Sequence, residues 1–186
     1  MRFDRDKRHR RSIRLRGYDY TQAGAYFVTI CSHGRECLFG EILEGEMELN
    51  QYGKVIAASW EKVNREYPGL KLDQWVVMPN HLHGIIAIND RTPGGSRTAP
   101  TTDMREPKTL GRLLGAFKTV STKQINILRG TPGVPLWQRN YYERIIRDED
   151  ELDRIRSYIE DNPRMWEMDR ENPVAETATS RESWKV

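Results

Sequence analysis

The sequence predicts an α+β domain, an antiparallel sheet with helices on one face, and most simply a ferredoxin-like fold. Runs of β-branched and aromatic residues alternate along the chain with stretches of helical periodicity. A Pro79-Asn80 pair between two apolar runs predicts a tight turn, and therefore two adjacent antiparallel strands. The order of these elements, with neighbouring strands paired, is typical of a sheet covered by helices.

Each element follows from a local pattern. The strands are predicted by β-branched and aromatic runs, although the pattern at 40–49 is weak and fits either a short strand or a hairpin. The helices are predicted by apolar residues that recur every three or four positions. The last helix has an acidic first turn, which complements the helix dipole, and Asn162-Pro163 ends it. The predicted strands are 25–31, 40–49, 71–78, 81–88 and 141–146, and the predicted helices are 52–66, 109–129 and 148–162.

The chain of 186 residues suits one domain with two tails. We expect a basic arm at 1–16, a domain over 17–166 and a C-terminal tail at 167–186. Within the domain, 89–108 is rich in Pro, Gly and Thr and is expected to be a mobile insertion. No apolar run approaches the ~18 residues that a membrane span needs, and no signal peptide is visible, so a cytoplasmic protein without membrane contact is expected.

Charge is distributed unevenly. Residues 1–16 hold seven Arg and one Lys against two Asp, whereas twelve acidic residues face six basic ones from Asp148 to the end. A basic arm is typical of nucleic-acid binding, and equally of a solvated tail. The candidate DNA-binding residues on the arm and on the 109–129 helix are Arg10, Arg11, Arg14, Arg16, Arg112, Lys118 and Lys123.

The two cysteines are too few for a disulfide framework, so reduced thiols are expected. Cys31, His33 and Cys37 resemble part of a zinc site. No fourth ligand follows at a suitable spacing, which disfavours that interpretation.

His81 and His83 are the strongest candidates for metal ligands. Alternate residues of a strand point to the same face, so the two imidazoles are expected side by side, with Leu82 in the core behind them. Two histidines bonded within the core are the structural alternative. The chain has Ile85 where a histidine-triad hydrolase needs a third His, and it lacks the spacing of zinc proteases.

Tyr158 and Asn162 lie four residues apart in the last predicted helix and therefore share a face. A tyrosine can act as a nucleophile, and an amide oxygen can join two imidazoles as a hard ligand for Mg²⁺ or Mn²⁺ bound to a phosphate. Tyr158 also borders an apolar stripe and fits a core tyrosine, and Asn162 fits a helix terminator. The residues alone leave both interpretations open.

Five blocks of the chain resemble the single-tyrosine transposases of the insertion-sequence-200-like group, and most closely the REP-associated tyrosine transposases. The resemblance covers about residues 14–166, in the expected order. The blocks are GAYFVTICSHGREC (24–37), VVMPNHLHGIIAI (76–88), TLGRLLGAFKTVSTKQIN (109–126), LWQRNYYERIIR (136–147) and the helix ending in YIEDNP (158–163).

The resemblance implies a metal-dependent enzyme that cleaves and rejoins single-stranded DNA. His81 and His83 match its metal-binding motif, and Tyr158 matches the nucleophile that forms a 5′-phosphotyrosine and leaves a 3′-hydroxyl. Asn162 matches the third ligand, which is Gln in many relatives, so the ligand here is shorter by one methylene. The implied partner is DNA whose palindromic repeats fold as hairpins, and the enzyme is expected to be a monomer rather than a homodimer.

Two other functions fit the same residues. One is a nickase of replication or transfer origins with the same metal and tyrosine chemistry. The other is a non-catalytic nucleic-acid-binding module that stacks bases on sheet aromatics such as Tyr26 and Phe27. Tyr141 and Tyr142 are rival nucleophiles, but they lie on a predicted strand without a ligand four residues later.

Overall fold

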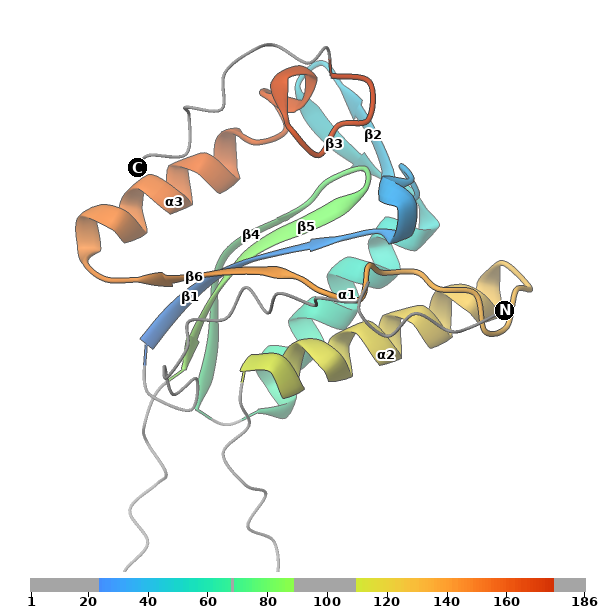
Figure 1. The fold of residues 1–186 in the computed structure, drawn as a ribbon, viewed down its shortest axis with the longest axis horizontal. Helices are drawn as coiled ribbons and strands as arrows, with labels where there is room; N and C mark the ends of the chain where they lie inside the picture. The colour runs from blue at the N-terminus through green and yellow to red at the C-terminus, as the bar shows by residue number, and fades with distance from the viewer. Residues whose placement is uncertain (1–23, 68, 89–109, 176–186) are drawn as a thin grey trace, which may run out of the picture.

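A four-stranded antiparallel sheet lies at the centre of the protein, with helices on both of its faces (Figure 1). The computed structural model describes residues 24–67, 69–88 and 110–175. The strands lie in the order β4-β5-β1-β6, and each neighbouring pair is antiparallel. They are β1 (Gly24–Cys31), β4 (Leu70–Val77), β5 (His81–Ile88) and β6 (Tyr142–Ile146). A separate hairpin consists of β2 (Gly40–Leu43) and β3 (Glu46–Leu49).

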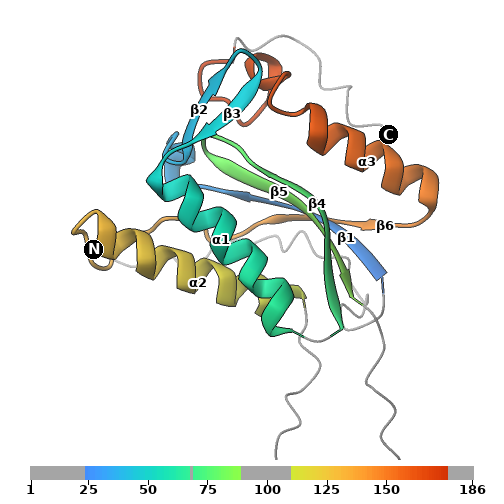
Figure 2. The same ribbon diagram turned by 180° about the vertical axis from the view of Figure 1, so that it is seen from behind.

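Helices α1 (Gln51–Glu66) and α2 (Leu110–Leu128) cover one face of the sheet (Figure 2). Each helix connects two parallel strands of the sheet, and the right-handed crossover rule assigns both helices to the same face. The larger core lies between them and the sheet. Trp60 of α1 packs so closely on β5 that a Cβ at Gly84 would lie 2.8 Å from its ring. Core residues on this face include Tyr26, Val28, Ile30, Ile56, Trp60, Leu82, Ile86, Leu114 and Phe117.

The third helix, α3 (Glu149–Asp161), lies on the opposite face of the sheet (Figure 1). Its apolar stripe packs in a smaller core on the other side of β1, β5 and β6. The α+β class and the antiparallel sheet are confirmed, but the expectation of helices on one face holds only for α1 and α2. Up to residue 175, where the described part of the chain stops, no strand follows α3, so the crossover rule does not determine its side. The smaller core contains Phe27, Ile85, Ile146, Leu152, Ile155 and Ile159.

The ends of α3 agree with the sequence patterns. Asp148 caps its N-terminus, where the carboxylate accepts a hydrogen bond of 2.7 Å from the backbone N–H of Glu151. Asn162 follows its last residue and begins the segment that leads to the short 3₁₀ helix Trp166–Met168. Tyr158, the candidate nucleophile, therefore lies in the last turn of α3, and Asn162, a candidate metal ligand, follows directly after it.

The basic arm at 1–16 and the expected insertion at 89–108 lie outside the described residues. Residues 167–175, the described part of the expected tail, pack on the domain, and Asp169, Glu171 and Asn172 are buried there. Within the described ranges, no helix combines the length and the apolar character that crossing a membrane requires.

Candidate active site

Two buried imidazoles project from β5 toward α3. Cys31 of β1 is the partner of His81 in the sheet, and Thr29 is the partner of His83, while Leu82 points into the larger core. The alternation predicted from the sequence is therefore observed. The ring centroids of His81 and His83 are 4.4 Å apart, and both side chains are almost completely buried.

Asn80 determines the protonation of His81. Its amide nitrogen donates to the backbone carbonyls of Arg35 (3.0 Å) and Glu171 (2.6 Å), which leaves its oxygen as an acceptor. That oxygen lies 2.8 Å from Nδ1 of His81, so Nδ1 carries the proton and donates. Nε2 of His81 consequently keeps its lone pair, as a metal ligand must.

His83 is held between the sheet and α3. Its Nδ1 lies 2.9 Å from the hydroxyl of Thr29, and its Nε2 lies 3.3 Å from the hydroxyl of Tyr158. The ring of Phe27 stacks on His83 with centroids 5.3 Å apart and meets Tyr158 edge-on at 6.0 Å. The strand and the helix thus bring the predicted nucleophile next to the predicted ligand.

Asp169 is a third group in this site that could ligate a metal ion. One carboxylate oxygen accepts a 2.7 Å hydrogen bond from the backbone N–H of Glu171, and the other lies 3.9 Å from Nε2 of His81. The ligand atoms of His81, His83 and Asp169 all lie within 4.8 Å of one another. Such a group of two imidazoles and one carboxylate can bind a metal ion.

Asn162, the third ligand expected from the sequence, is also brought to this site. It is buried, and its amide influences the pKa values of both His81 and Tyr158. Its Oδ1 has no partner with hydrogen-bond geometry, and the same is true of Nε2 of His81 and Oδ2 of Asp169. Buried polar atoms without partners cost free energy, and a cation bound among these three would satisfy them.

The protonation states suit cation binding. Burial lowers the pKa of His81 to about 4, although Asp169 and Glu171 oppose that shift. Burial, and then the neighbouring His81, lower the pKa of His83 well below its ordinary value. Both imidazoles are therefore neutral at physiological pH. Burial, and then the Asp169 charge, raise the pKa of Tyr158, so its hydroxyl is a phenol rather than a phenolate.

The rival residues have other partners. Tyr141 lies against the Lys118 ammonium, and Tyr142 packs edge-on to Phe27 with centroids 6.3 Å apart. The Cys31 thiol donates to Glu171, and burial together with that carboxylate raises its pKa to about 12, so it is not a ready zinc ligand.

The predicted DNA-binding residues divide into three groups. Arg10, Arg11, Arg14 and Arg16 lie outside the described residues. Arg112 and Lys123 are exposed on α2. Lys118, by contrast, donates to the carbonyls of residues 138, 139 and 140, so its three N–H groups bind the protein itself.

Sequence reasoning missed Asp169. It lies after α3 in an irregular segment, where no period predicts the direction of a side chain, and it falls within the expected tail at 167–186. The only signal was a cluster of acidic residues near the C-terminus, which by itself fits a solvated surface.

Comparisons with known proteins agree with this architecture. An uncharacterized protein of Haemophilus influenzae is 40% identical over 168 residues, which span 87% of this chain and 92% of the relative. A solved structure of a REP-associated tyrosine transposase bound to a REP hairpin superposes with a TM-score of 0.51 at 22% identity. That match covers 82% of this chain and 72% of the transposase. No protein-family model matches the chain.

A putative transposase from Deinococcus radiodurans R1 matches 79% of this chain and 95% of its own length, with 16% identity and a TM-score of 0.45. This value is too low to support the fold assignment. The first structural match confirms the expected resemblance at the level of the fold. The chain therefore belongs to one family with the Haemophilus influenzae protein and has the fold of the REP-associated tyrosine transposase.

Proposed function

We propose that the protein is a metal-dependent tyrosine transposase that cleaves and rejoins single-stranded, hairpin-forming DNA. One observation carries the proposal: the Tyr158 hydroxyl lies 3.3 Å from Nε2 of His83, inside a buried group with His81 and Asp169. A tyrosine in contact with a potential metal site fits a covalent phosphoryl-transfer enzyme better than a structural core.

His81, His83 and Asp169 would hold the metal ion, with the Asn162 oxygen as a further ligand. The donor set combines imidazole nitrogens with hard oxygens, which suits Mn²⁺ or Mg²⁺. When bound, the ion would polarise the scissile phosphate and offset the Asp169 charge that raises the pKa of the phenol.

The chain's own groups would align the phosphate and transfer it from the DNA 3′-oxygen to Tyr158. The Tyr158 oxygen attacks phosphorus and loses its proton to solvent, a 5′-phosphotyrosine forms, and the bond to the 3′-oxygen breaks. The released 3′-oxygen takes up a proton. Because the phosphodiester energy stays in the covalent link, a 3′-hydroxyl can attack it later, rejoin a strand and regenerate Tyr158.

The proposed DNA partner follows from the structural match. That transposase was solved bound to a REP hairpin. We propose that this protein also takes DNA whose palindromic repeats fold as hairpins, in the bacterial cytoplasm. The non-catalytic alternative loses its main support, because Tyr26 is fully buried and Phe27 is 3% exposed. Helices cover both faces of the sheet, so neither ring can stack on a base.

A covalent adduct tests the proposal. The full-length protein is incubated with labelled single strands that contain palindromic repeats, and with Mn²⁺ or Mg²⁺, and adducts that survive denaturation are measured. We expect an adduct with the wild type and with Tyr142→Phe, and none with Tyr158→Phe. His81→Ala and His83→Ala should lose the adduct and retain most DNA binding, because phosphate contacts lie largely elsewhere.

Two results would contradict the assignment: no adduct with any repeat strand, or an adduct that persists in Tyr158→Phe. An origin nickase would form the same adduct. It differs in substrate, because it would cleave strands without palindromes as readily as hairpin-forming ones.

A further inference from the structure

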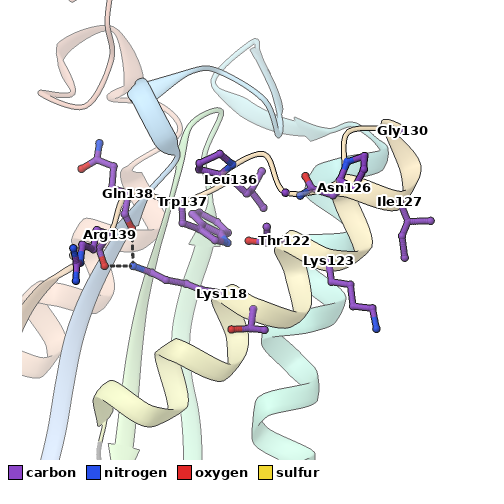
Figure 3. Close-up of a pocket in the computed structure, with 14 residues that line it drawn as sticks. Lys118, Thr122, Lys123, Asn126, Ile127, Gly130, Leu136, Trp137, Gln138 and Arg139 are labelled. Atoms are coloured by element: carbon purple, nitrogen blue, oxygen red, sulfur yellow. Dashed lines mark hydrogen bonds between the residues drawn. The ribbon is translucent and has the colours of Figure 1, made fainter.

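We propose that the pocket between α2 and residues 130–139 binds a stretch of the single-stranded DNA substrate. The pocket has a volume of about 900 Å³, which is in the range of small-molecule sites. The inference rests on the proposed function, because it says where the DNA lies beyond the reacting phosphate. Figure 3 shows the pocket and the residues that line it.

The pocket combines an apolar floor with cations at its margin. Leu136 and the largely buried Trp137 form the floor, and Ile127 adds apolar surface that is 70% exposed. Lys123 and Arg139 are exposed lining residues, and in Figure 3 they lie on opposite sides of Trp137. Apolar surface next to separated positive charges suits bases that are linked by phosphates.

The charge around the pocket favours a polyanion. Residues 110–142 contain five Lys or Arg and no Asp or Glu. The opposite side of the molecule has the reverse character, since α3 contains six Asp or Glu and two Arg. A cationic face on one side of a protein with a net charge of only +3 would attract DNA phosphates to α2.

The pocket is preformed because its loop is bound to α2 at several points. Lys118 donates to three successive loop carbonyls, and Trp137 donates to the hydroxyl of Ser121 over 2.9 Å. At the other end, Asn126 donates to the carbonyl of Val134 over 2.9 Å. A rigid pocket needs little ordering when a ligand binds.

The pocket lies on the α2 side of the sheet, and the candidate active site lies on the α3 side, but their backbones are close. Residue 138 donates from its backbone to the carbonyl of Cys31, and Cys31 pairs with His81 across the sheet. Adjacent strands lie about 4.8 Å apart, so two strand spacings, roughly 10 Å, separate this loop from the backbone of His81. A DNA strand that contacts both places must therefore pass from the α2 face of the sheet to the α3 face over a short distance.

Binding is measured by fluorescence anisotropy, with an oligothymidine of about 16 nucleotides, the upper end of single-strand site sizes. All proteins carry Tyr158→Phe, so that cleavage does not interfere. The double variant Lys123→Ala/Arg139→Ala should bind about tenfold more weakly. The slope of log K for binding against log salt concentration should also be smaller in magnitude by about 1.4, because two contacted phosphates of a single strand contribute that much. The control is Lys71→Ala, which removes one charge on the opposite edge strand, and its loss in log K should be much less than half that of the double variant.

Apolar contact is tested at constant charge. Ile127→Ser should weaken binding about fivefold, the low end of the loss for one stacked base. Leu128→Ser is its control, because Leu128 is 51% exposed on the same helix and does not line the pocket. Variants that bind like their controls would overturn the proposal. So would a lower oligomeric mass in Ile127→Ser, measured by sedimentation, because the pocket would then join two copies of the chain.

The test is independent of catalysis. If the pocket variants lose oligonucleotide binding while the wild type forms no adduct, the pocket is supported and the proposed function fails. If adducts form normally and the pocket variants bind like their controls, the proposed function is supported and the pocket proposal fails.

Discussion

At the scale of single residues, the orientation of the two imidazoles depends on neighbours that would not themselves ligate a metal ion. Asn80 donates to two carbonyls and must accept from His81, while Thr29 contacts Nδ1 of His83. Both contacts leave the Nε2 atoms pointing into the site. Partners of this kind usually matter almost as much as the ligands themselves.

Removing these partners should weaken metal binding. Thr29→Val keeps the side-chain shape, and Asn80→Ala removes the acceptor of His81. We expect each to lower Mn²⁺ affinity about 10- to 100-fold, measured by isothermal titration calorimetry. Ser59→Ala is the control, because Ser59 is also buried but bonds to Gln124 on the other face of the sheet. Unchanged affinity in Thr29→Val and Asn80→Ala would show that neither orients a ligand.

At the scale of elements, α3 is fixed to the edge strand β4 by a bidentate ion pair. Arg156, two residues before Tyr158, donates from Nε and from a terminal nitrogen to the two oxygens of Asp73, each over 2.8 Å. Asp73 lies where the β4–β5 register shifts between Leu72 and Trp75. This irregularity places a carboxylate opposite the helix.

The ion pair predicts an acid-sensitive helix position. The hydrogen bond from Arg156 lowers the pKa of Asp73 from 3.8 to about 2. Because the folded state holds the proton less tightly, the stabilisation is present above pH ~4 and is lost as pH falls toward 2. Asp73→Asn should unfold at lower urea concentration than the wild type at pH 6, and the difference should shrink near pH 2. A difference that is constant over this range would rule out the pair as its source.

The sequence predicts the elements well because their patterns are local. The alternation of His81, Leu82 and His83 decides which side chains share a face, and helical spacing decides where α1, α2 and α3 lie. The side of the sheet that α3 covers is not local information. Its apolar stripe fits either face, and only packing against Phe27 and Ile85 shows which one is used.

At the scale of the whole molecule, the site is assembled from parts that are distant in the sequence. β5 contributes two imidazoles, α3 contributes Tyr158, and the segment after α3 contributes Asp169. Sequence spacing identified the first two groups but not the third, since its position depends on how an irregular segment folds back. The sequence also does not predict that Lys118 binds loop carbonyls. A basic helical face has the same sequence pattern whether its cations bind DNA or protein carbonyls.

One chain supplies both the imidazoles and the tyrosine, and this predicts catalysis within a single subunit. Tyr158 contacts His83 of its own chain, and the packing of Ile155 and Ile159 together with Arg156 keeps α3 in place. A mixture of Tyr158→Phe and His81→Ala should therefore form no DNA adduct, because neither protein has a complete site.

The control is the wild type diluted with an equal amount of either variant, which should retain its own adduct. If the tyrosine were exchanged between subunits, mixed dimers would combine an intact histidine site with an intact Tyr158. The mixture would then regain about a quarter to a half of the wild-type adduct, as random pairing of two protein types allows. Recovery of that size would mean that α3 leaves its own sheet in the active form, against the ion pair and the apolar core that hold it here.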